Sequence, residues 1–128
     1  MTRPDATMGP EIRYLGMLSH ERLDVYRCAI EFHSLARRIV RALPRGNADL
    51  ADQLMRASRS AVLNIAEGAG KTSRAHQARY WADARGSALE CGACLDVAAL
   101  EEIIDSELLR SGKELLERIV SMLTKMVR

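Results

Sequence analysis

Few residues in this sequence have the types and spacing that chemistry requires, and the first candidate is the Gly-Lys-Thr triplet at Gly70–Thr72. The same triplet ends a phosphate-binding P-loop, which needs another glycine five positions before the glycine of the triplet. That position holds Ile65, which belongs to the apolar periodicity of a predicted helix. A P-loop also follows a buried β-strand, and no segment of the sequence has strand periodicity. We therefore exclude nucleotide binding of the P-loop kind.

A second candidate is the C-x-x-C spacing of Cys91 and Cys94. A redox motif of this kind places its first cysteine at a helix N-terminus, where the helix dipole lowers the thiol pKa. Here the pair lies in the middle of a predicted helix, and His20, His33 and His76 add no metal-ligand spacing to it. We expect both thiols to pack in the core, and a metal or redox role is the alternative.

Carboxylates are the third candidate, because Glu67 and Glu90 could resemble the inward ligands of di-iron bundles. That chemistry uses repeated Glu-x-x-His pairs, and the sequence has none; Glu31 and His33 have the wrong spacing. Nothing favours a nucleophile with its base either. We predict no catalytic residue, no metal and no cofactor, and hence a protein that is not an enzyme.

Composition defines the class of protein. The chain has 128 residues, of which 48% are hydrophobic and 28% charged, the balance of one soluble domain. Its three cysteines are an odd number and no apolar leader opens it, so we expect a cytoplasmic protein without disulfides. No apolar run approaches the roughly 20 residues of a membrane span, so no membrane association is predicted.

Helical periodicity organises the chain into four segments. Apolar residues recur at spacings of three and four in each segment, which places them on one face of a helix. Short connections make consecutive helices antiparallel neighbours, and the prediction is an all-α, up-down-up-down four-helix bundle. Residues 1–18 lack a period and are predicted to form a flexible arm, with the bundle at residues 19–128. The apolar stripes run through Val25–Leu43, Leu50–Gly68, Trp81–Ala98 and Leu108–Val127.

Capping and turn residues predict where these helices begin and end. Glycines in particular supply positive φ cheaply at helix ends. The boundary residues are Pro44 and Gly46 after the first helix, Asn47 or Asp49 before the second, Gly68 and Gly70 after it, Thr72 or Ser73 before the third, Ile104 at its end, and Ser106 before the fourth.

Two helices carry more than a core stripe. The third is rich in small residues, including Gly86 and Gly92, which would allow another helix to approach closely. The fourth has a second apolar stripe at Leu109–Val127 beside its first one. This extra surface is used either by the bundle's own neighbouring helices or by another subunit.

Charge is distributed unevenly although the formal net charge is only +2. Six arginines lie within Arg37–Arg59, against Asp49 and Asp52, and five acids with no base lie within Asp96–Glu107. The topology brings these two regions to one end of the bundle, where we expect intramolecular ion pairs. The opposite end has few acids and could engage phosphates, with Tyr80 available to stack on a base. Its predicted nucleic-acid-binding residues are Lys71, Arg74, Arg79, Lys125 and Arg128.

Three runs of residues carry a family resemblance. They are LDVYRCAIEF at Leu23–Phe32, QLMRASRSAVLNIAEGAG at Gln53–Gly70 and RYWADARGSALE at Arg79–Glu90. The chain from about Leu23 onward resembles the four-helix bundle family of intervening sequences in bacterial large-subunit ribosomal RNA genes. That family is similar to the accessory variability protein of diversity-generating retroelements.

The resemblance implies a homo-oligomer, a pentamer, that binds RNA or a protein partner such as a reverse transcriptase. It carries no catalytic residues, and the motif positions Asn64, Glu67, Gly68 and Arg85 are expected to be structural, with Asn64 and Glu67 holding free backbone groups or an arginine such as Arg56 or Arg85. The functional hypothesis is a non-catalytic RNA-binding or ribonucleoprotein accessory module. A scaffold that docks a polypeptide on the paired stripes of the fourth helix is the alternative.

Overall fold

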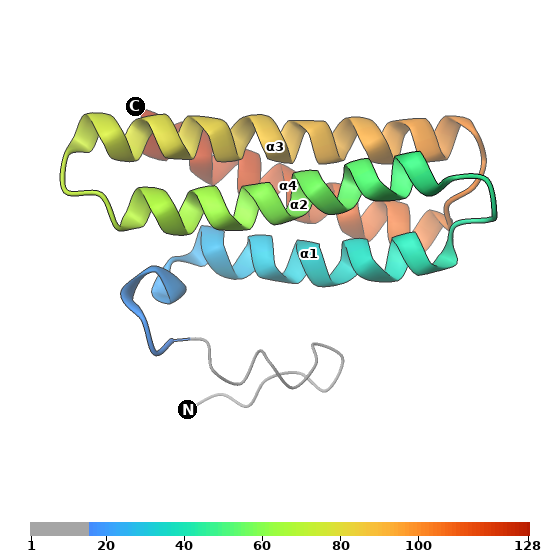
Figure 1. Ribbon diagram of the computed structural model, residues 1–128, viewed down its shortest axis with the longest axis horizontal. Coiled ribbons are helices and arrows are strands. Elements are labelled where there is room, and N and C mark those ends of the chain that lie inside the picture. Colours follow the sequence, from blue (N-terminus) through green and yellow to red (C-terminus); the bar gives the residue numbers. More distant parts are fainter. Residues whose placement is uncertain (1–15) are drawn as a thin grey trace.

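The computed structural model describes residues 16–128, and this part of the chain is an all-α bundle (Figure 1). Residues 1–15 of the predicted arm lie outside the described residues. The polypeptide enters the bundle through a turn and a short 3₁₀ helix, η3. The elements are η3 (Ser19–Arg22), α1 (Asp24–Ala42), α2 (Ala48–Ala69), α3 (Arg74–Leu100) and α4 (Ser106–Val127).

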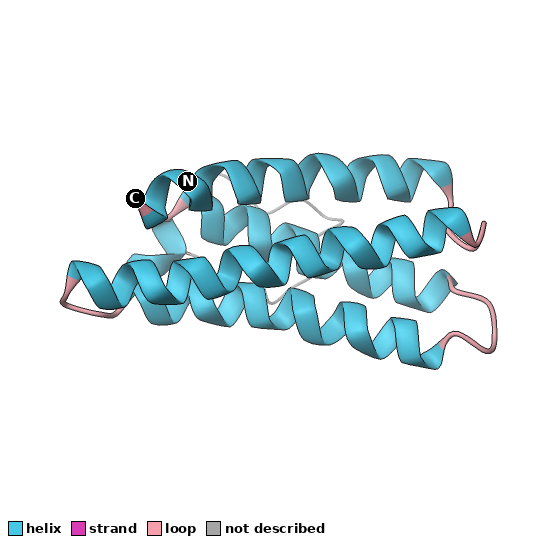
Figure 2. Ribbon diagram, turned by 90° about the horizontal axis from the view of Figure 1, so that it is seen from above, coloured by secondary structure: helices cyan, strands magenta, loops and turns pink. Residues whose placement is uncertain are grey.

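The helices alternate in direction, which confirms the predicted up-down-up-down topology. Contacts join α1 to α2, α2 to α3, α3 to α4, and α4 back to α1, so the four helices surround one common core. Figures 1 and 2 show the short turns at the two ends of the bundle. The α2–α3 turn lies at the end where α1 begins and α4 finishes, and the α1–α2 and α3–α4 connections lie at the other end (Figure 1).

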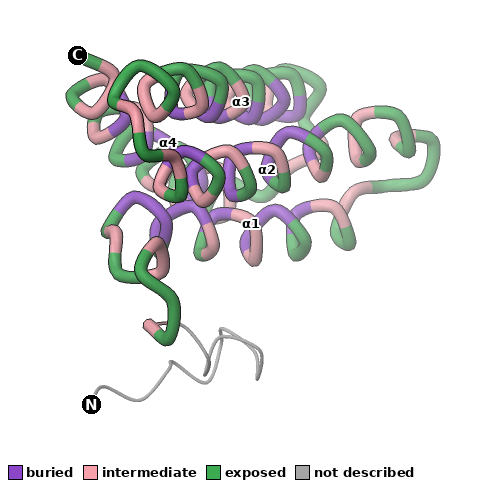
Figure 3. The backbone as a smooth tube through the Cα atoms, turned by 60° about the vertical axis from the view of Figure 1, so that its left-hand side comes forward, coloured by how far each residue is buried: buried purple, intermediate pink, exposed green. Residues whose placement is uncertain are grey.

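The predicted apolar stripes form this core. Ile39, Ile65, Leu95, Ile119 and Leu123 are among its fully buried side chains, and every helix contributes at least one of them. Figure 3 shows the buried positions on the inner sides of the helices, with exposed positions outside. Both stripes of α4 pack against this core, since their residues are buried or partly buried. The second stripe of α4 is therefore used within the bundle.

Side-chain caps were predicted correctly for one helix and wrongly for two. Ser73 accepts a hydrogen bond from the amide of His76 at 3.0 Å, as expected for the N-cap of α3. The N-cap of α4 is Asp105 and not Ser106, because the Asp105 carboxylate reaches the amides of Glu107 and Leu108. Asn47 occupies the N-cap position of α2, but no side-chain cap bond forms there.

Helix α3 is shorter than predicted. It ends at Leu100, where we had expected an end near Ile104. Glu102 takes the left-handed conformation, with φ of 58°, and the amide of Ile103 bonds to the carbonyl of Ala98 at 3.0 Å. This bond satisfies a free carbonyl at the helix end, a role that glycine usually makes possible. Because position 102 holds glutamate and not glycine, the sequence did not indicate that the helix ends here.

Gly68 and Gly70 do not supply positive φ, so that prediction was wrong. Gly70 has φ of −82°, and the positive-φ glycines of the described chain are Gly16 and Gly46. Gly68 is instead a buried helical residue beneath Trp81. A Cβ atom at Gly68 would lie 2.6 Å from Nε1 of Trp81, inside any normal contact distance. Glycine is needed here because the indole ring lies directly on the helix backbone.

We predict that Gly68→Ala lowers the free energy of unfolding by about 1–3 kcal/mol, because Trp81 must move away from α2. The same displacement weakens the bond from Trp81 Nε1 to the carbonyl of Ile65, which spans 3.2 Å. Urea unfolding followed by circular dichroism measures the change. Gly70→Ala is the control, since its nearest new contact is an ordinary 3.6 Å. Equal effects of the two substitutions would contradict this account of Gly68.

Candidate nucleic-acid interface

The basic residues predicted to bind nucleic acid come from three segments that meet at the α2–α3 end. Lys71 lies in the turn after α2, Arg74 and Arg79 lie in the first part of α3, and Lys125 and Arg128 lie at the end of α4. In Figure 1, the C-terminus lies behind the first part of α3, at the same end of the bundle as the α2–α3 turn. The fold therefore places residues 52 or more positions apart in the sequence next to one another. Arg79, Lys125 and Arg128 are exposed there.

Arg74 holds this end together. Its guanidinium donates hydrogen bonds to the main-chain carbonyls of Met126 and Arg128, and it lies 5.7 Å from the centre of the Trp81 ring system. The last carbonyls of a helix have no partner within the helix, so Arg74 caps α4 from another helix. Arg74 is itself exposed, so its guanidinium lies at the surface of this end.

Lys71 is also engaged, although weakly. Its ammonium group lies 3.5 Å from the carboxylate of Glu67 and 5.0 Å from the centre of the Tyr80 ring. Both partners of the ion pair are solvent-exposed, at 37% and 56% of their side-chain surface. Exposed pairs contribute little free energy, so a phosphate could replace Glu67 at Lys71. Tyr80 is half-buried and faces Lys71, which differs from the free stacking surface we had expected.

The N-terminus of α3 adds to the positive character of this end. Backbone amides in the first turn of a helix point outward, and the helix dipole gives them partial positive charge. No acidic residue occupies the first turn of α3, where Arg74 and His76 stand instead. Helix ends of this kind attract anions such as phosphate. The α2–α3 end thus combines a helix N-terminus with five basic side chains.

Two of the four family-motif residues, Gly68 and Arg85, contact another helix directly, and Asn64 and Glu67 make local contacts. The side-chain amide of Asn64 donates to the carbonyl oxygen of Ser60 at 3.0 Å and to its hydroxyl at 3.1 Å. That hydroxyl lies 2.9 Å from the hydroxyl of Ser87, which connects α2 with α3. Asn64 therefore holds a backbone carbonyl and not an arginine.

Arg85 has a different partner from the one we considered. Its Nε donates to the hydroxyl of Thr124 at 2.8 Å, and Thr124 donates in turn to the carbonyl of Val120. This bond connects α3 with α4 near the basic end. Glu67 pairs with Lys71 at the last turn of α2. Among residues 16–128, no hydrogen bond or ion pair joins Arg85 to Asn64 or Glu67.

The cysteines pack in the core, as the sequence predicted. Cys28, Cys91 and Cys94 are all buried with free thiols. Burial is the main cause that raises the pKa of Cys91 to about 12, and the neighbouring Cys94 and Glu90 contribute to the rise. The Cys91 thiol therefore stays protonated at neutral pH. Nucleophilic attack and metal binding both require the thiolate, so Cys91 is suited to neither. Within the described chain, no group of three or more His, Cys, Asp or Glu residues could hold a metal ion.

Five of the six arginines within Arg37–Arg59 do not form the expected ion pairs among the described residues. Across residues 16–128, no ion pair joins Arg41, Arg56 or Arg59 to a carboxylate, and the same is true of Arg38 and Arg45. The acidic segment instead uses bases on α4. Lys113 lies 2.5 Å from Asp96, and Arg110 binds Glu107 and Glu114 within its own helix. The two Arg110 pairs have the three- and four-residue spacings that bring side chains together on one helix, and the Asp96–Lys113 pair joins α3 to α4.

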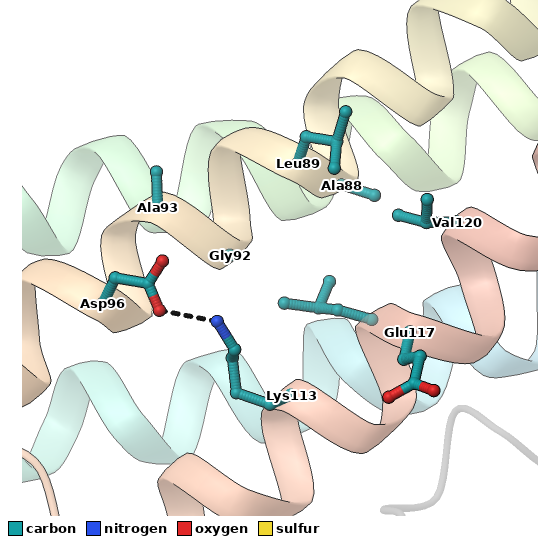
Figure 4. A pocket seen from close by; sticks show the side chains of 9 residues that line it. Ala88, Leu89, Gly92, Ala93, Asp96, Lys113, Glu117 and Val120 are labelled. Carbon is teal, nitrogen blue, oxygen red and sulfur yellow. Dashed lines mark hydrogen bonds and ion pairs between the residues drawn. The ribbon is translucent and has the colours of Figure 1, made fainter.

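A shallow apolar groove lies between α3 and α4 (Figure 4). Its volume is about 380 Å³; Gly92, Leu116 and Val120 help to line it, and the Asp96–Lys113 pair stands on one side. Leu89 beside the groove is 49% exposed. Gly86 lies on the exposed side of α3, where a Cβ atom would meet no atom of the described chain within 4 Å. Gly86 thus faces outward, away from the close helix contact that we expected for it within the bundle.

The architecture defines an up-down-up-down bundle of four helices with one basic end. None of the described helices is long and apolar enough to cross a membrane. The chain belongs to the family of 23S rRNA-intervening sequence proteins, whose family model matches residues 21–125. This match confirms the resemblance found in the sequence. No curated protein matches the chain.

We predict that Arg74→Ala lowers the free energy of unfolding by about 1 kcal/mol, because the last carbonyls of α4 lose their cap. Denaturant titration of the purified protein measures it. Arg79→Ala removes the same charge one and a half turns later on α3, at an exposed position with no ion pair in the described chain, and should leave stability nearly unchanged. If the two substitutions were equally mild, Arg74 would not be the cap of α4.

Proposed function

We propose that this protein is a non-catalytic, cytoplasmic accessory protein that binds RNA through its α2–α3 end. The observation that carries the proposal is the convergence of five basic residues from three chain segments around the N-terminus of α3. The family description links its members to intervening sequences of 23S rRNA, which supports RNA as the polyanion. Free, buried thiols agree with a reducing compartment.

Phosphate contacts of this kind give affinity without base recognition. Lysine and arginine neutralise phosphates and release counterions, so the observed binding constant falls as salt rises. Arg79, Lys125 and Arg128 are exposed, and Lys71 can exchange an exposed carboxylate for a phosphate. Arg74 contributes charge while it remains bound to α4. In this proposal, Lys71, Arg79, Lys125 and Arg128 contact RNA directly, and Arg74 holds the end of α4 in place.

We predict that a labelled structured RNA binds with an affinity that falls steeply with salt in a fluorescence anisotropy titration. The triple variant Arg79→Gln, Lys125→Gln and Arg128→Gln should reduce the slope of log affinity against log salt by about two to three, since each lost phosphate contact removes roughly 0.7–0.9. Arg74 stays unchanged in this variant because its loss would also affect folding.

A charge-matched control is Arg110→Gln, Lys113→Gln and Arg118→Gln, which removes three positive charges from α4 away from the α2–α3 end. It should leave the salt slope nearly unchanged. Equal losses in both variants would show that net charge, and not this end, controls binding. An absence of binding at low salt would reject the RNA-binding proposal itself.

We further propose that the chain forms a homo-oligomer through the outer face of α3, with the five copies that the resemblance implies. Leu89, Val97 and Leu100 are exposed on this helix, and Leu100 is 85% exposed. Mid-helix glycines cost about 1 kcal/mol each relative to alanine, and Gly86 has no contact in the described chain to offset that cost. The second stripe of α4, for which contact with another subunit was one of two alternatives, lies against the core.

We predict that sedimentation velocity finds an oligomer and that Leu89→Glu dissociates it without loss of helix content. Leu63→Glu is the matched control, because Leu63 is similarly exposed but lies on α2. The control protein should stay assembled. A monomeric wild-type protein would reject self-association, and specific retention of another polypeptide, such as a reverse transcriptase, on the α3 face would then favour the scaffold alternative.

A further inference from the structure

His33 lies between α1 and α2 in a fixed orientation. Its Nδ1 is 2.7 Å from the hydroxyl of Ser58, which is only 1% exposed. That hydroxyl donates to the carbonyl of Met55 at 3.2 Å. In the imidazolium form of His33, Nδ1 donates to the Ser58 hydroxyl and Nε2 is a second donor.

Nε2 has no hydrogen-bond partner in residues 16–128 and is not sealed in the core. No buried side-chain nitrogen or oxygen of the described residues lacks a partner, so an unpartnered Nε2 must reach solvent. Nε2 of His33 is thus available for a hydrogen bond to a group other than Ser58. A protonated Nε2 could donate to an external anion.

Two arginines act on this histidine from two helices. Burial lowers the pKa of His33, and the charges of Arg59 on α2 and Arg37 on α1 lower it further. Arg59 directly follows Ser58, the hydrogen-bond partner of His33, and Arg37 follows His33 by one turn of α1. Both positive charges therefore act on the ring from close by.

The positive surface continues beyond these residues. Arg41 follows Arg37 by one turn, and Arg56 precedes Arg59 by one turn, so each pair lies on neighbouring surface of its helix. Arg41, Arg56 and Arg59 are exposed, and none has an ion pair in the described part of the chain. A phosphate near His33 would reduce the repulsion among these charges.

We propose that His33 and Arg59, with Arg37 beside them, form a phosphate-binding site on the α1–α2 face of the bundle. Its ligand is a backbone phosphate of the RNA that the α2–α3 end engages, so the inference rests on the proposed function. Arg59 lies about 15 Å along α2 from Ala69 at the end of that helix, which allows one RNA to contact both places. The imidazolium form of His33 completes the site, because both ring nitrogens are then donors.

The proposal makes binding proton-linked. A phosphate beside His33 favours the imidazolium and raises its pKa, by about one for an opposite charge at contact distance. Between the free and bound pKa values the complex holds more protons than the free protein, so affinity increases as pH falls. His33→Gln keeps a polar side chain but cannot titrate, and its affinity should lose this pH dependence.

NMR titration of the histidine rings tests the site in the intact protein. The probes are a single-stranded oligouridylate and inorganic phosphate, each compared with sodium chloride at equal ionic strength. Chloride controls for screening of the arginines, which would raise the pKa of His33 without a specific site. The expected result is a larger rise with RNA and with phosphate than with chloride. The three histidines are assigned with His33→Gln and His76→Gln.

Arg59→Gln and Arg56→Gln are the paired variants. Arg59→Gln should raise the pKa of His33 in the free protein and remove the additional rise caused by phosphate. Arg56→Gln removes the same charge one turn earlier, and Arg56 is not among the charges that act on His33, so the phosphate response should persist. Equal behaviour of the two variants would overturn the assignment of Arg59.

The outcomes separate the two proposals. His76 lies in the first turn of α3 and reports on the α2–α3 end. If RNA moves the His76 resonance while His33 keeps its free pKa with both probes, the RNA-binding proposal stands and the α1–α2 site is rejected. If phosphate raises the pKa of His33 beyond chloride but RNA binds nowhere, the phosphate site is present and RNA is the wrong ligand. If neither probe exceeds chloride, the site does not exist.

Discussion

The contact between Trp81 and Gly68 determines how the functional end of this bundle is built. The indole ring lies on the backbone of α2, and its Nε1 donates to the carbonyl of Ile65. The guanidinium of Arg74 lies over the same ring. Arg74 also donates to the main chain at the end of α4, including the carbonyl of Met126. One aromatic side chain thus sets the relative positions of three helices. Within the Asn-Ile-Ala-Glu-Gly motif, Ile65 and Gly68 form the α2 half of this contact.

This constraint explains why the basic residues gather where they do. Because α2 and α3 are held together beside their turn, Lys71 and Arg79 project from a rigid support, and α4 brings Lys125 and Arg128 to the same place. Rigid placement reduces the entropy that side chains lose when they bind a polyanion. In the proposed account, the core residue Trp81 supports binding without contacting RNA.

The sequence was sufficient for the bundle but insufficient for its surface contacts. Helical periodicity identified the core because burial of apolar stripes is the dominant energy and repeats regularly along the chain. The Ser73 N-cap was also predictable, because it depends on residues that are neighbours in the sequence. The partner of Arg74 depended on where α4 ends, 52 residues later, and the role of Gly68 depended on the ring of Trp81. Arg41, Arg56 and Arg59 have no ion pair within the described residues, and the sequence did not predict this because ion pairing was judged by region and not by individual distances.

The most direct measurement follows the indole resonance of Trp81, the single tryptophan of the chain, in ¹H–¹⁵N NMR spectra as RNA is added. The account predicts one indole signal that exchanges slowly with solvent, because Nε1–H is bonded to Ile65 in the core, and that shifts when RNA engages the end around Arg74. A rapidly exchanging indole proton would contradict the Trp81–α2 contact. An indole signal unchanged at RNA saturation would contradict the placement of RNA at the α2–α3 end.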